Sequence, residues 1–336
     1  MKFLVIGLGS MGKRRIRCLQ RLGQSDIFGF DLRQDRCEEV HQNYQVPTFE
    51  DWNEVQNIPT DAWIISTPPD LHINYALMAV QKDIHFFTEA SVCDDHYDTL
   101  IEQLKIKKVV GFPSCTMRYF PGPSKIKELI DKDRIGTPLS FTYQSGQYLP
   151  DWHPWEDYRT FYVSKKETGA CREIVPFELE WLTWVFGWPT SVTCMKDKLG
   201  TLENDIDDIY QLLLKFGDNM IGHLMVDVIS RPAVRHIRII GSKGTIEWIH
   251  GQNIIRVSNE DYSWETINLD PGKAEKGYIS PEEPYDDEVR DFIETIQGKR
   301  HLNFTFEDDH RLLKVLYGAE TASNNLHTIK KIKNEL

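Results

Sequence analysis

The beginning of the chain contains the feature that most limits its possible folds. The apolar run Phe3–Ile6 leads directly into Gly7-Leu8-Gly9-Ser10-Met11-Gly12, a helical stretch follows, and a second apolar run (27–30) ends at Asp31. Gly7 permits a tight turn, Gly9 lets the backbone approach a pyrophosphate, and Gly12 lets helix and strand pack closely. This order predicts a strand–helix–strand unit that binds a dinucleotide, with the diphosphate at the helix N-terminus.

Asp31 bears on which dinucleotide is bound. A carboxylate at the end of the second strand can accept hydrogen bonds from both ribose hydroxyls, and it would repel a 2′-phosphate. The sequence therefore favours NAD over NADP. Arg33, close behind, could offer a cation to a phosphate and weaken this preference, or it could be a solvated loop residue.

Size and composition exclude several classes of protein. The chain has 336 residues, enough for two domains with hydrophobic cores, and a formal net charge of −12, which argues against non-specific nucleic-acid binding. The first apolar run is short and is followed by glycines and Lys13-Arg14-Arg15, so we expect no signal peptide and no membrane span. The cysteines are scattered without a CxxC pair, so we expect neither a metal site nor disulfides, and a cytoplasmic location.

Strands and helices alternate over the first third of the chain. Besides the two strands above, we expect strands at 46–49, 62–65, 85–88 and 108–112, and helices at 13–22, 35–43, 70–81 and 94–105. Continuous apolar strands between helices indicate a parallel sheet that is covered on both faces. The predicted first domain, residues 1–120, is a doubly wound α/β domain.

The pattern changes after residue 120. We expect a helix at 125–133, strands at 140–148, 191–195, 210–216, 221–228, 235–240, 245–248 and 253–257, and closing helices at 282–297 and 308–328. The predicted second domain, residues 121–336, is therefore α+β with a large, mainly antiparallel open sheet. Its C-terminal helices could pack back near the first domain.

Taken together, the motifs resemble those of the glucose-fructose oxidoreductase / inositol dehydrogenase / MocA family of two-domain dehydrogenases. Besides the glycine-rich turn, the resemblance rests on Ser66-Thr67-Pro68-Pro69-Asp70-Leu71-His72, Arg118-Tyr119-Phe120-Pro121, the stretch 130–136 and Ile240-Gly241-Ser242-Lys243-Gly244-Thr245. It implies a Rossmann domain that binds NAD, followed by a domain that binds a sugar-like small molecule. In this family the open sheet face commonly forms a homodimer or homotetramer interface.

The cofactor-binding residues come partly from the motif and partly from the resemblance. The resemblance places Ser66, Thr67, Pro68 and His72 at the nicotinamide half of the cofactor, and it equates Glu89 with the Glu of the family's Glu-Lys-Pro signature. A simple strand-to-helix turn with Asp70 as N-cap would also explain these residues. The full predicted set is Gly7, Leu8, Gly9, Ser10, Met11, Gly12, Asp31, Arg33, Ser66, Thr67, Pro68, His72 and Glu89.

The chain departs from the family pattern where the proton is usually carried. Glu-Lys-Pro is replaced by Glu89-Ala90-Ser91, and alignment with the family pattern puts Phe177 at the position of the catalytic histidine. General acid–base assistance is worth about 10²–10⁴ in rate. Either another residue carries the proton, or the protein binds NAD without the usual redox chemistry.

Replacements are available in the insertion before Gly169 and just after it. This stretch, 151–168, mixes aromatic side chains, including Trp155, with groups that can move protons or bind anions. It could form a wall of the substrate pocket, or it could be a surface loop that fills the gap between domains. We predict His153, Glu173 and Lys166 as acid–base candidates, and Arg118, Tyr158 and Arg159 as substrate-binding candidates. An Arg172–Glu173 ion pair is the structural alternative for Glu173.

The sequence therefore predicts an NAD-dependent oxidoreductase that acts on a hydroxyl or keto carbon of a sugar, sugar acid or nucleotide-linked sugar. Two alternatives stay open. One is a catalytically silent NAD-binding regulatory or scaffold protein. The other is a reductase of a non-sugar substrate, as in biliverdin reductase, which resembles the family and also lacks the signature lysine.

Overall fold

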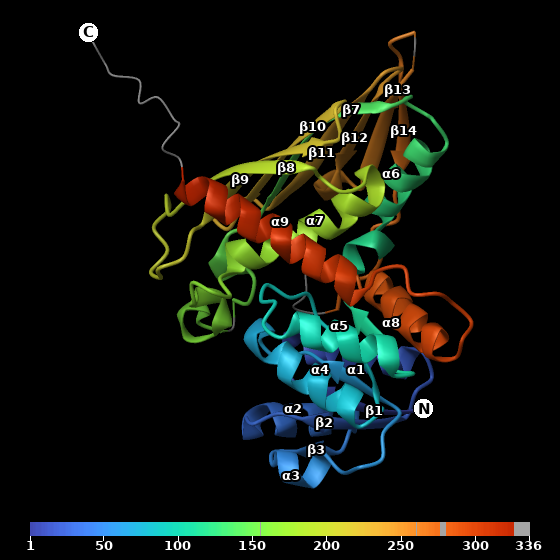
Figure 1. The fold of residues 1–336 in the computed structure, drawn as a ribbon, viewed down its shortest axis with the longest axis vertical. Coiled ribbons are helices and arrows are strands. Elements are labelled where there is room, and N and C mark those ends of the chain that lie inside the picture. Colours follow the sequence, from blue (N-terminus) through green and yellow to red (C-terminus); the bar gives the residue numbers. More distant parts are fainter. Residues whose placement is uncertain (155, 260, 276–279, 326–336) are drawn as a thin grey trace. The chain divides into compact units, whose positions relative to one another are not determined.

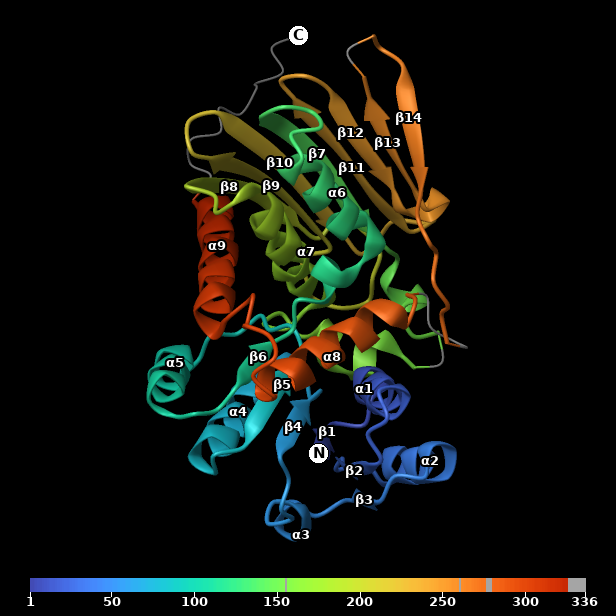
Figure 2. The ribbon, with the colours of Figure 1, turned by 90° about the vertical axis from the view of Figure 1, so that its right-hand side faces the viewer.

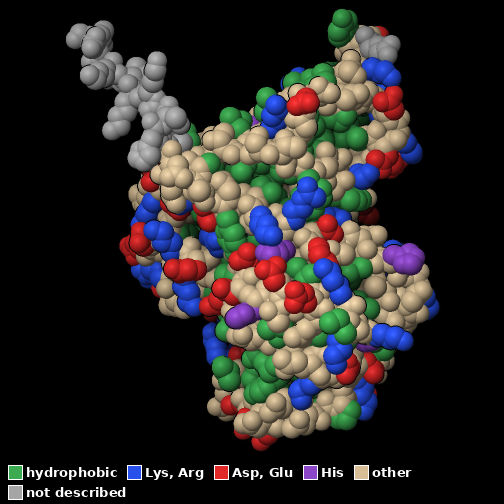
Figure 3. Space-filling view, in the orientation of Figure 1, with side chains coloured by type: hydrophobic (Ala, Val, Ile, Leu, Met, Phe, Trp, Pro, Cys, Tyr) green, Lys and Arg blue, Asp and Glu red, His purple; other side chains and the backbone are tan. Residues whose placement is uncertain are grey.

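The computed structural model describes residues 1–154, 156–259, 261–275 and 280–325. They form two compact units, one made of 1–124 and 270–311, the other of 125–269 and the chain from 312 on (Figure 1). Basic and acidic side chains are interspersed over the face shown in Figure 3. Within the described ranges, no helix has both the length and the apolar character needed to cross a membrane.

The first unit is built on a parallel sheet. Its strand order is β3-β2-β1-β4-β5-β6, with β1 and β4 side by side where the order reverses. Both strands consist almost wholly of buried apolar residues, as expected for a sheet covered on both faces. The strands are β1 (Lys2–Ile6), β2 (Asp26–Phe30), β3 (Thr48–Phe49), β4 (Ala62–Ile65), β5 (His85–Thr88) and β6 (Gly111–Pro113).

Helices of the first unit connect these strands, and one comes from much later in the chain. That late helix, α8 (Glu283–Ile296), packs against α1. The others are α1 (Ser10–Arg21), α2 (Gln34–Tyr44), α3 (Trp52–Val55), η1 (Pro69–Leu71), α4 (His72–Gln81), α5 (Tyr97–Ile106) and η2 (Thr116–Tyr119). Two further helices, α6 (Pro121–Asp131) and α9 (Phe306–Asn324), contain residues of both units.

The second unit contains a larger sheet with the order β14-β13-β12-β11-β7-β10-β9-β8. Its neighbouring strands run antiparallel except β7 and β10, which are parallel. The strands are β7 (Pro138–Gly146), β8 (Ser191–Asp197), β9 (Ile209–Phe216), β10 (Met220–Asp227), β11 (Val234–Gly241), β12 (Thr245–Ile249), β13 (Ile254–Ser258) and β14 (Trp264–Asn268). The predicted fold class, a Rossmann-like parallel sheet followed by a mainly antiparallel one, is confirmed.

Helix α7 (Ala170–Phe186) covers one face of this sheet (Figure 2). Trp181 is fully buried, and its ring makes edge-type contacts with Tyr143 and Trp248 in the core of this unit. The connecting 3-10 turns are η3 (Leu149–Asp151), η4 (Tyr158–Thr160), η5 (Tyr162–Ser164) and η6 (His250–Gln252).

Several elements differ from the sequence-based expectation. The strand β14 was not predicted, because its residues are mostly exposed and show no alternation of apolar and polar side chains. The expected helix at 94–105 begins only at Tyr97, because His96 has a left-handed backbone conformation with φ of 60°. The helix expected at 125–133 begins earlier, at Pro121, where proline is compatible with a first helical turn.

Candidate cofactor and substrate sites

The glycine-rich turn between β1 and α1 has no room for side chains at two positions. Gly7 has φ of +88°, and a Cβ there would lie 2.6 Å from the carbonyl oxygen of Ser66. A Cβ at Gly12 would lie 1.8 Å from the carbonyl oxygen of Gly7. The tight turn predicted at Gly7 is confirmed by its positive φ, and the close packing predicted at Gly12 is confirmed because a side chain there would push the start of α1 away from β1.

The N-terminus of α1 fits an anion. Its N-cap, Gly9, provides no capping side chain, and the first turn contains no acidic residue. Beyond its chain neighbours, a Cβ at Gly9 would approach only the Arg36 guanidinium among the described residues, at 3.5 Å or more. The first-turn N–H groups and the helix dipole can thus hold the diphosphate of a dinucleotide.

Asp31 lies at the expected end of β2 and is almost fully buried. Its Oδ2 accepts a hydrogen bond from the backbone N–H of Leu8 at 2.8 Å, and its Oδ1 accepts one from the N–H of Arg33 at 2.9 Å. The Arg33 guanidinium pairs with Asp35. A second arginine, Arg36, lies beside Asp31, with its Nη1 3.6 Å from Oδ2. Sequence reasoning missed Arg36, although it lies in the first turn of the helix that follows Asp31.

The segment after β4 is held in place by His72. Its Nε2 lies 2.8 Å from the carbonyl oxygen of Thr67 and, because that oxygen can only accept, Nε2 carries the proton. Burial lowers the pKa of His72, so the ring is neutral at pH 7. In this structure His72 therefore fixes the shape of the Ser66–Pro68 turn. Contact of these residues with nicotinamide stays a prediction.

Glu89 lies at the end of β5, beside the same turn. Its Oε1 accepts a hydrogen bond from Ser66 Oγ at 2.9 Å, and both its oxygens bind Arg15. Arg15 is fully buried, and sequence reasoning missed it. The only signal in the sequence is a run of arginines within a helix that also carries the apolar residues of the core.

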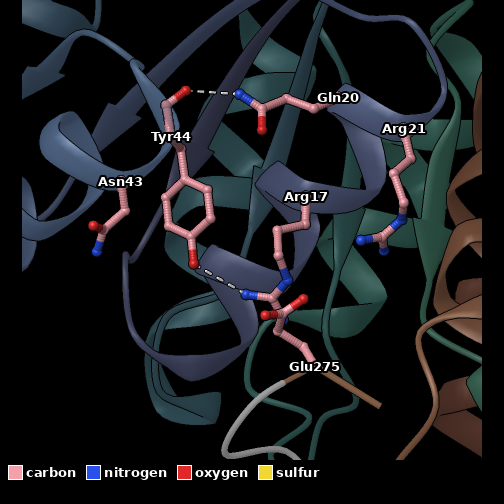
Figure 4. A pocket seen from close by; sticks show the side chains of 6 residues that line it. All are labelled: Arg17, Gln20, Arg21, Asn43, Tyr44 and Glu275. Atoms are coloured by element: carbon pink, nitrogen blue, oxygen red, sulfur yellow. Dashed lines mark hydrogen bonds between the residues drawn. The ribbon is translucent and has the colours of Figure 1, made fainter. Parts of the chain in front are cut away.

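A polar cavity of about 540 Å³ lies beside the C-terminal half of α1 (Figure 4). Arg17 Nη1 donates to Tyr44 Oη at 3.2 Å, and Gln20 Nε2 donates to the Tyr44 carbonyl oxygen at 2.8 Å. Arg17 also binds Glu282 of the same unit. The residues lining the cavity are Arg17, Gln20, Arg21, Asn43, Tyr44 and Glu275. Because its arginines pair with Glu282 and Asp286 at the start of α8, we assign it no ligand.

In the second unit, a chain of contacts links two of the three acid–base candidates. The His153 ring stacks on Phe161 with centroids 5.8 Å apart, and Phe161 meets the Tyr162 ring edge-on at 5.8 Å. Tyr162 Oη donates to Glu173 Oε1 at 3.3 Å. His153 and Glu173 thus border one aromatic cluster at the start of α7. Lys166, the third candidate, is exposed in the loop before this helix.

The substrate-binding candidates all contact other parts of the protein. Tyr158 Oη accepts from the backbone N–H of Glu203 at 3.0 Å, and the Arg159 guanidinium binds the Glu203 carboxylate, so both hold the same loop. Arg118, in the first unit, donates to the carbonyl oxygen of Asn303 at 3.1 Å. Arg172, which the structural alternative for Glu173 would pair with that carboxylate, binds the carboxylate of Glu320 at 2.6 Å. Trp155 lies outside the described residues.

Comparison with known proteins identifies both domains. Residues 1–104 match the model of an oxidoreductase family with an NAD-binding Rossmann fold, and residues 124–247 match the GFO/IDH/MocA C-terminal domain. The myo-inositol 2-dehydrogenase of Thermotoga maritima is 21% identical over 98% of both chains.

Solved structures share the fold over nearly the whole length. Levoglucosan dehydrogenase in complex with NADH and levoglucosan superimposes with a TM-score of 0.81 at 15% identity, over 96% of this chain and 97% of that one. An oxidoreductase from Agrobacterium radiobacter in complex with NAD+, L-tartaric acid and magnesium gives a TM-score of 0.83 at 12% identity, over 97% and 96%. At these identities the likeness concerns the fold alone. With both domain models matched in order, the chain belongs to the glucose-fructose oxidoreductase / inositol dehydrogenase / MocA family of oxidoreductases, and its first domain is an NAD-binding Rossmann domain.

Proposed function

We propose that this protein transfers a hydride between NAD and a hydroxyl or keto carbon of a sugar, sugar acid or nucleotide-linked sugar. The observation that carries the proposal is the intact glycine turn with Asp31 beside it, in a chain that matches both domains of a dehydrogenase family. The named relatives oxidise polyhydroxylated rings, inositol and levoglucosan, which supports a substrate of the same kind.

The cofactor would be held mainly by backbone groups. The N–H groups at the start of α1 would bind the diphosphate, and Asp31 would accept the hydroxyls of the adenosine ribose. Ser66, Thr67, Pro68, His72 and Glu89 would border the nicotinamide half. When bound, NAD accepts or supplies the hydride, so the chain itself must supply the group that takes the hydroxyl proton.

Glu173 and His153 are the groups we propose for that proton. Both border the aromatic cluster of Phe161 and Tyr162, where a flat apolar surface can pack against a sugar ring. Tyr162 orients the Glu173 carboxylate through its hydroxyl. Lys166, being exposed, would have to move to take part, and Arg118, Tyr158 and Arg159 would contact substrate only after exchanging their protein partners.

We further propose a division of labour between domains, with cofactor binding in residues 1–120 and substrate binding and self-association in 121–336. The sheet face opposite α7 carries exposed apolar side chains on β9, β10 and β11, among them Leu213 (50% exposed), Ile221 (55%) and Ile240 (47%). A second copy of the chain would cover them. Light scattering should then give the mass of a dimer or tetramer, and I221D should lower it.

The proposal is tested by incubating the protein with NAD+ and a panel of sugars, sugar acids and nucleotide-linked sugars while NADH absorbance is followed, with NADP+ in parallel. Formation of NADH with at least one member supports it. Saturable binding of NADH without turnover of any member would favour the silent NAD-binding protein. This alternative is supported by Ala90, which stands where the resemblance expects the family lysine.

A further inference from the structure

Arg15 is a buried cation that joins two carboxylates of the first unit. It lies on α1, just after the glycine turn, and none of its side chain is exposed. Its Nε and Nη2 bind the two oxygens of Glu89 at 2.8 and 2.7 Å, and its Nη1 binds Glu288 Oε2 at 2.8 Å. One planar guanidinium therefore fixes the position of both carboxylates.

Glu288 ties this pair to the loop that follows β6. It lies on α8 and is completely buried. Its Oε1 accepts from Ser114 Oγ at 2.9 Å and from the N–H of Cys115 at 2.7 Å, and its Oε2 accepts from Thr116 Oγ1 at 2.7 Å. The loop after β6 is thus connected through Glu288 to Arg15.

Glu89 extends the connection to the turn after β4. It follows β5, and Ser66 Oγ donates to its Oε1 at 2.9 Å. The Arg15 cluster, which we define as Arg15, Glu288, Glu89 and Ser66, therefore links the carboxyl ends of β4, β5 and β6. In a doubly wound domain the carboxyl ends of these three strands lie on the nicotinamide side of the bound dinucleotide, whereas the β1–α1 turn receives the diphosphate.

The cluster demands an arginine. A lysine ammonium also has three N–H donors, but all three are on one nitrogen. It cannot bind both Glu89 oxygens through a planar fork while a separate nitrogen reaches Glu288. A buried charge without its partners is strongly unfavourable, so each member of the cluster restricts where the others can lie. The Arg15 guanidinium also packs over the Phe87 ring of β5, 4.4 Å from its centroid.

We propose that Arg15 and Glu288 are positioning residues that set Ser66 and Glu89 for the nicotinamide half of the cofactor. This inference rests on the proposed function of that edge. Neither residue needs to touch the cofactor, and loss of either would loosen the turns after β4 and β5 relative to each other. The effect should be confined to ligands that contain nicotinamide.

The test compares NADH with ADP-ribose, which lacks nicotinamide, by calorimetric titration of the full chain. R15K and E288Q should weaken NADH binding about 5- to 10-fold, the size expected for loss of well-placed hydrogen bonds, and change ADP-ribose binding less than twofold. D286N is the matched control. It also neutralises an acid of α8 that pairs with an arginine of α1, Arg21 at 2.6 Å, but outside the cluster. D286N should change neither affinity.

Equal weakening of both ligands, or no change in either, would overturn the proposal. If R15K and E288Q do not fold, T116V removes the hydrogen bond that Thr116 Oγ1 donates to Glu288 Oε2 and should give a smaller loss of the same NADH-selective kind, and its absence would count against the proposal. Failure of the wild type to bind either ligand would instead contradict the cofactor role itself. Lack of turnover with every sugar would contradict the proposed function and leave this comparison valid.

Discussion

The Asp31 carboxylate accepts a hydrogen bond from the backbone N–H of Leu8 at 2.8 Å. This bond connects the end of β2 to the glycine turn after β1, so the two parts of the chain that would hold the adenosine half of NAD are fixed to each other. The same carboxylate also accepts from the N–H of Arg33. Asp31 therefore shapes its own loop besides being placed to bind ribose.

We expect the wild type to bind NADH at least about tenfold more tightly than NADPH, because Asp31 would repel a 2′-phosphate. D31S should weaken NADH binding and narrow this ratio, with Arg36 close enough to assist a phosphate. D26N, which neutralises an exposed acid at the opposite end of β2, is the control and should leave the ratio unchanged. The ratio of the two affinities is measured by titrating each variant with NADH and with NADPH. A ratio unaffected by D31S would contradict the role of Asp31.

Glu282 should be among the most sensitive positions for stability. It binds Arg14, Arg17 and Arg21 of α1. E282Q should lower the free energy of unfolding by about 3 kcal/mol or more, because it leaves buried arginines without their carboxylate. D26N removes an exposed partner of Lys2 and should cost less than about 1 kcal/mol. Similar losses for both variants in urea denaturation would show that this ion cluster does not stabilise the α1–α8 contact.

The same carboxylate should contribute to acid sensitivity. Burial raises the pKa of Glu282, but the bonds and charges of Arg17, Arg14 and Arg21 outweigh burial and hold the pKa below its ordinary value of 4.5. A carboxylate whose pKa is lower in the folded than in the unfolded state stabilises the protein at pH values above its unfolded-state pKa. This stabilisation is lost as the pH falls through the folded-state pKa. Below about pH 4.5 the wild type should therefore lose stability more steeply than E282Q. Parallel slopes in this range would contradict the assignment.

Asp309 should have the opposite effect on the pH dependence of stability, making the protein less stable as the pH rises. Burial raises its pKa to about 7, the nearby charge of Asp308 adds to this, and the hydrogen bond from Tyr97 Oη at 2.7 Å opposes it. A raised folded-state pKa means that stability is greatest below the unfolded value of 3.8 and falls as pH rises to about 7. D309N should remove that fall and be more stable than the wild type at pH 8. E307Q, at an exposed neighbour, should keep the wild-type slope.

The acid–base assignment is tested at Glu173. If it carries the hydroxyl proton, E173Q should lower kcat by about 10²-fold or more with a substrate found in the panel, while NADH affinity holds. H153A is tested in the same way, and Y162F should have a smaller effect, because it removes only the bond that orients Glu173. A wild-type rate in both E173Q and H153A would place the proton carrier elsewhere.

The sequence predicts most of the first unit because its signals are local. The first strand, the glycine turn and the acid after the second strand all lie within one short stretch of sequence. The steric need for glycine in that turn is confirmed by the structure at Gly7 and Gly12. The strand β14 was not predicted because its exposed residues show no periodic pattern. The start of α5 was placed too early because the sequence does not show that His96 has a left-handed conformation.

Long-range ion pairing could not be predicted. Arginines on a helix ordinarily indicate a solvated face, yet Arg15 is fully buried because Glu288, far away in the chain, lies on α8 against α1. In the same way the contacts of Tyr158 and Arg159 with Glu203 could not be read from the sequence, while their predicted role in substrate binding stays a prediction. The partner of a charged side chain can be identified only once the fold shows which distant residues lie next to it.

The most direct test of the whole account is a calorimetric titration of wild type and G12A with NADH. A Cβ at residue 12 would lie 1.8 Å from the Gly7 carbonyl oxygen and must displace the turn, whereas G251A adds a methyl group that, apart from the adjoining backbone, has no described atom within 4 Å. We predict saturable binding by the wild type and by G251A, and at least about tenfold weaker binding by G12A. Absence of saturation by the wild type at millimolar NADH, or unchanged affinity in a folded G12A, would contradict the account.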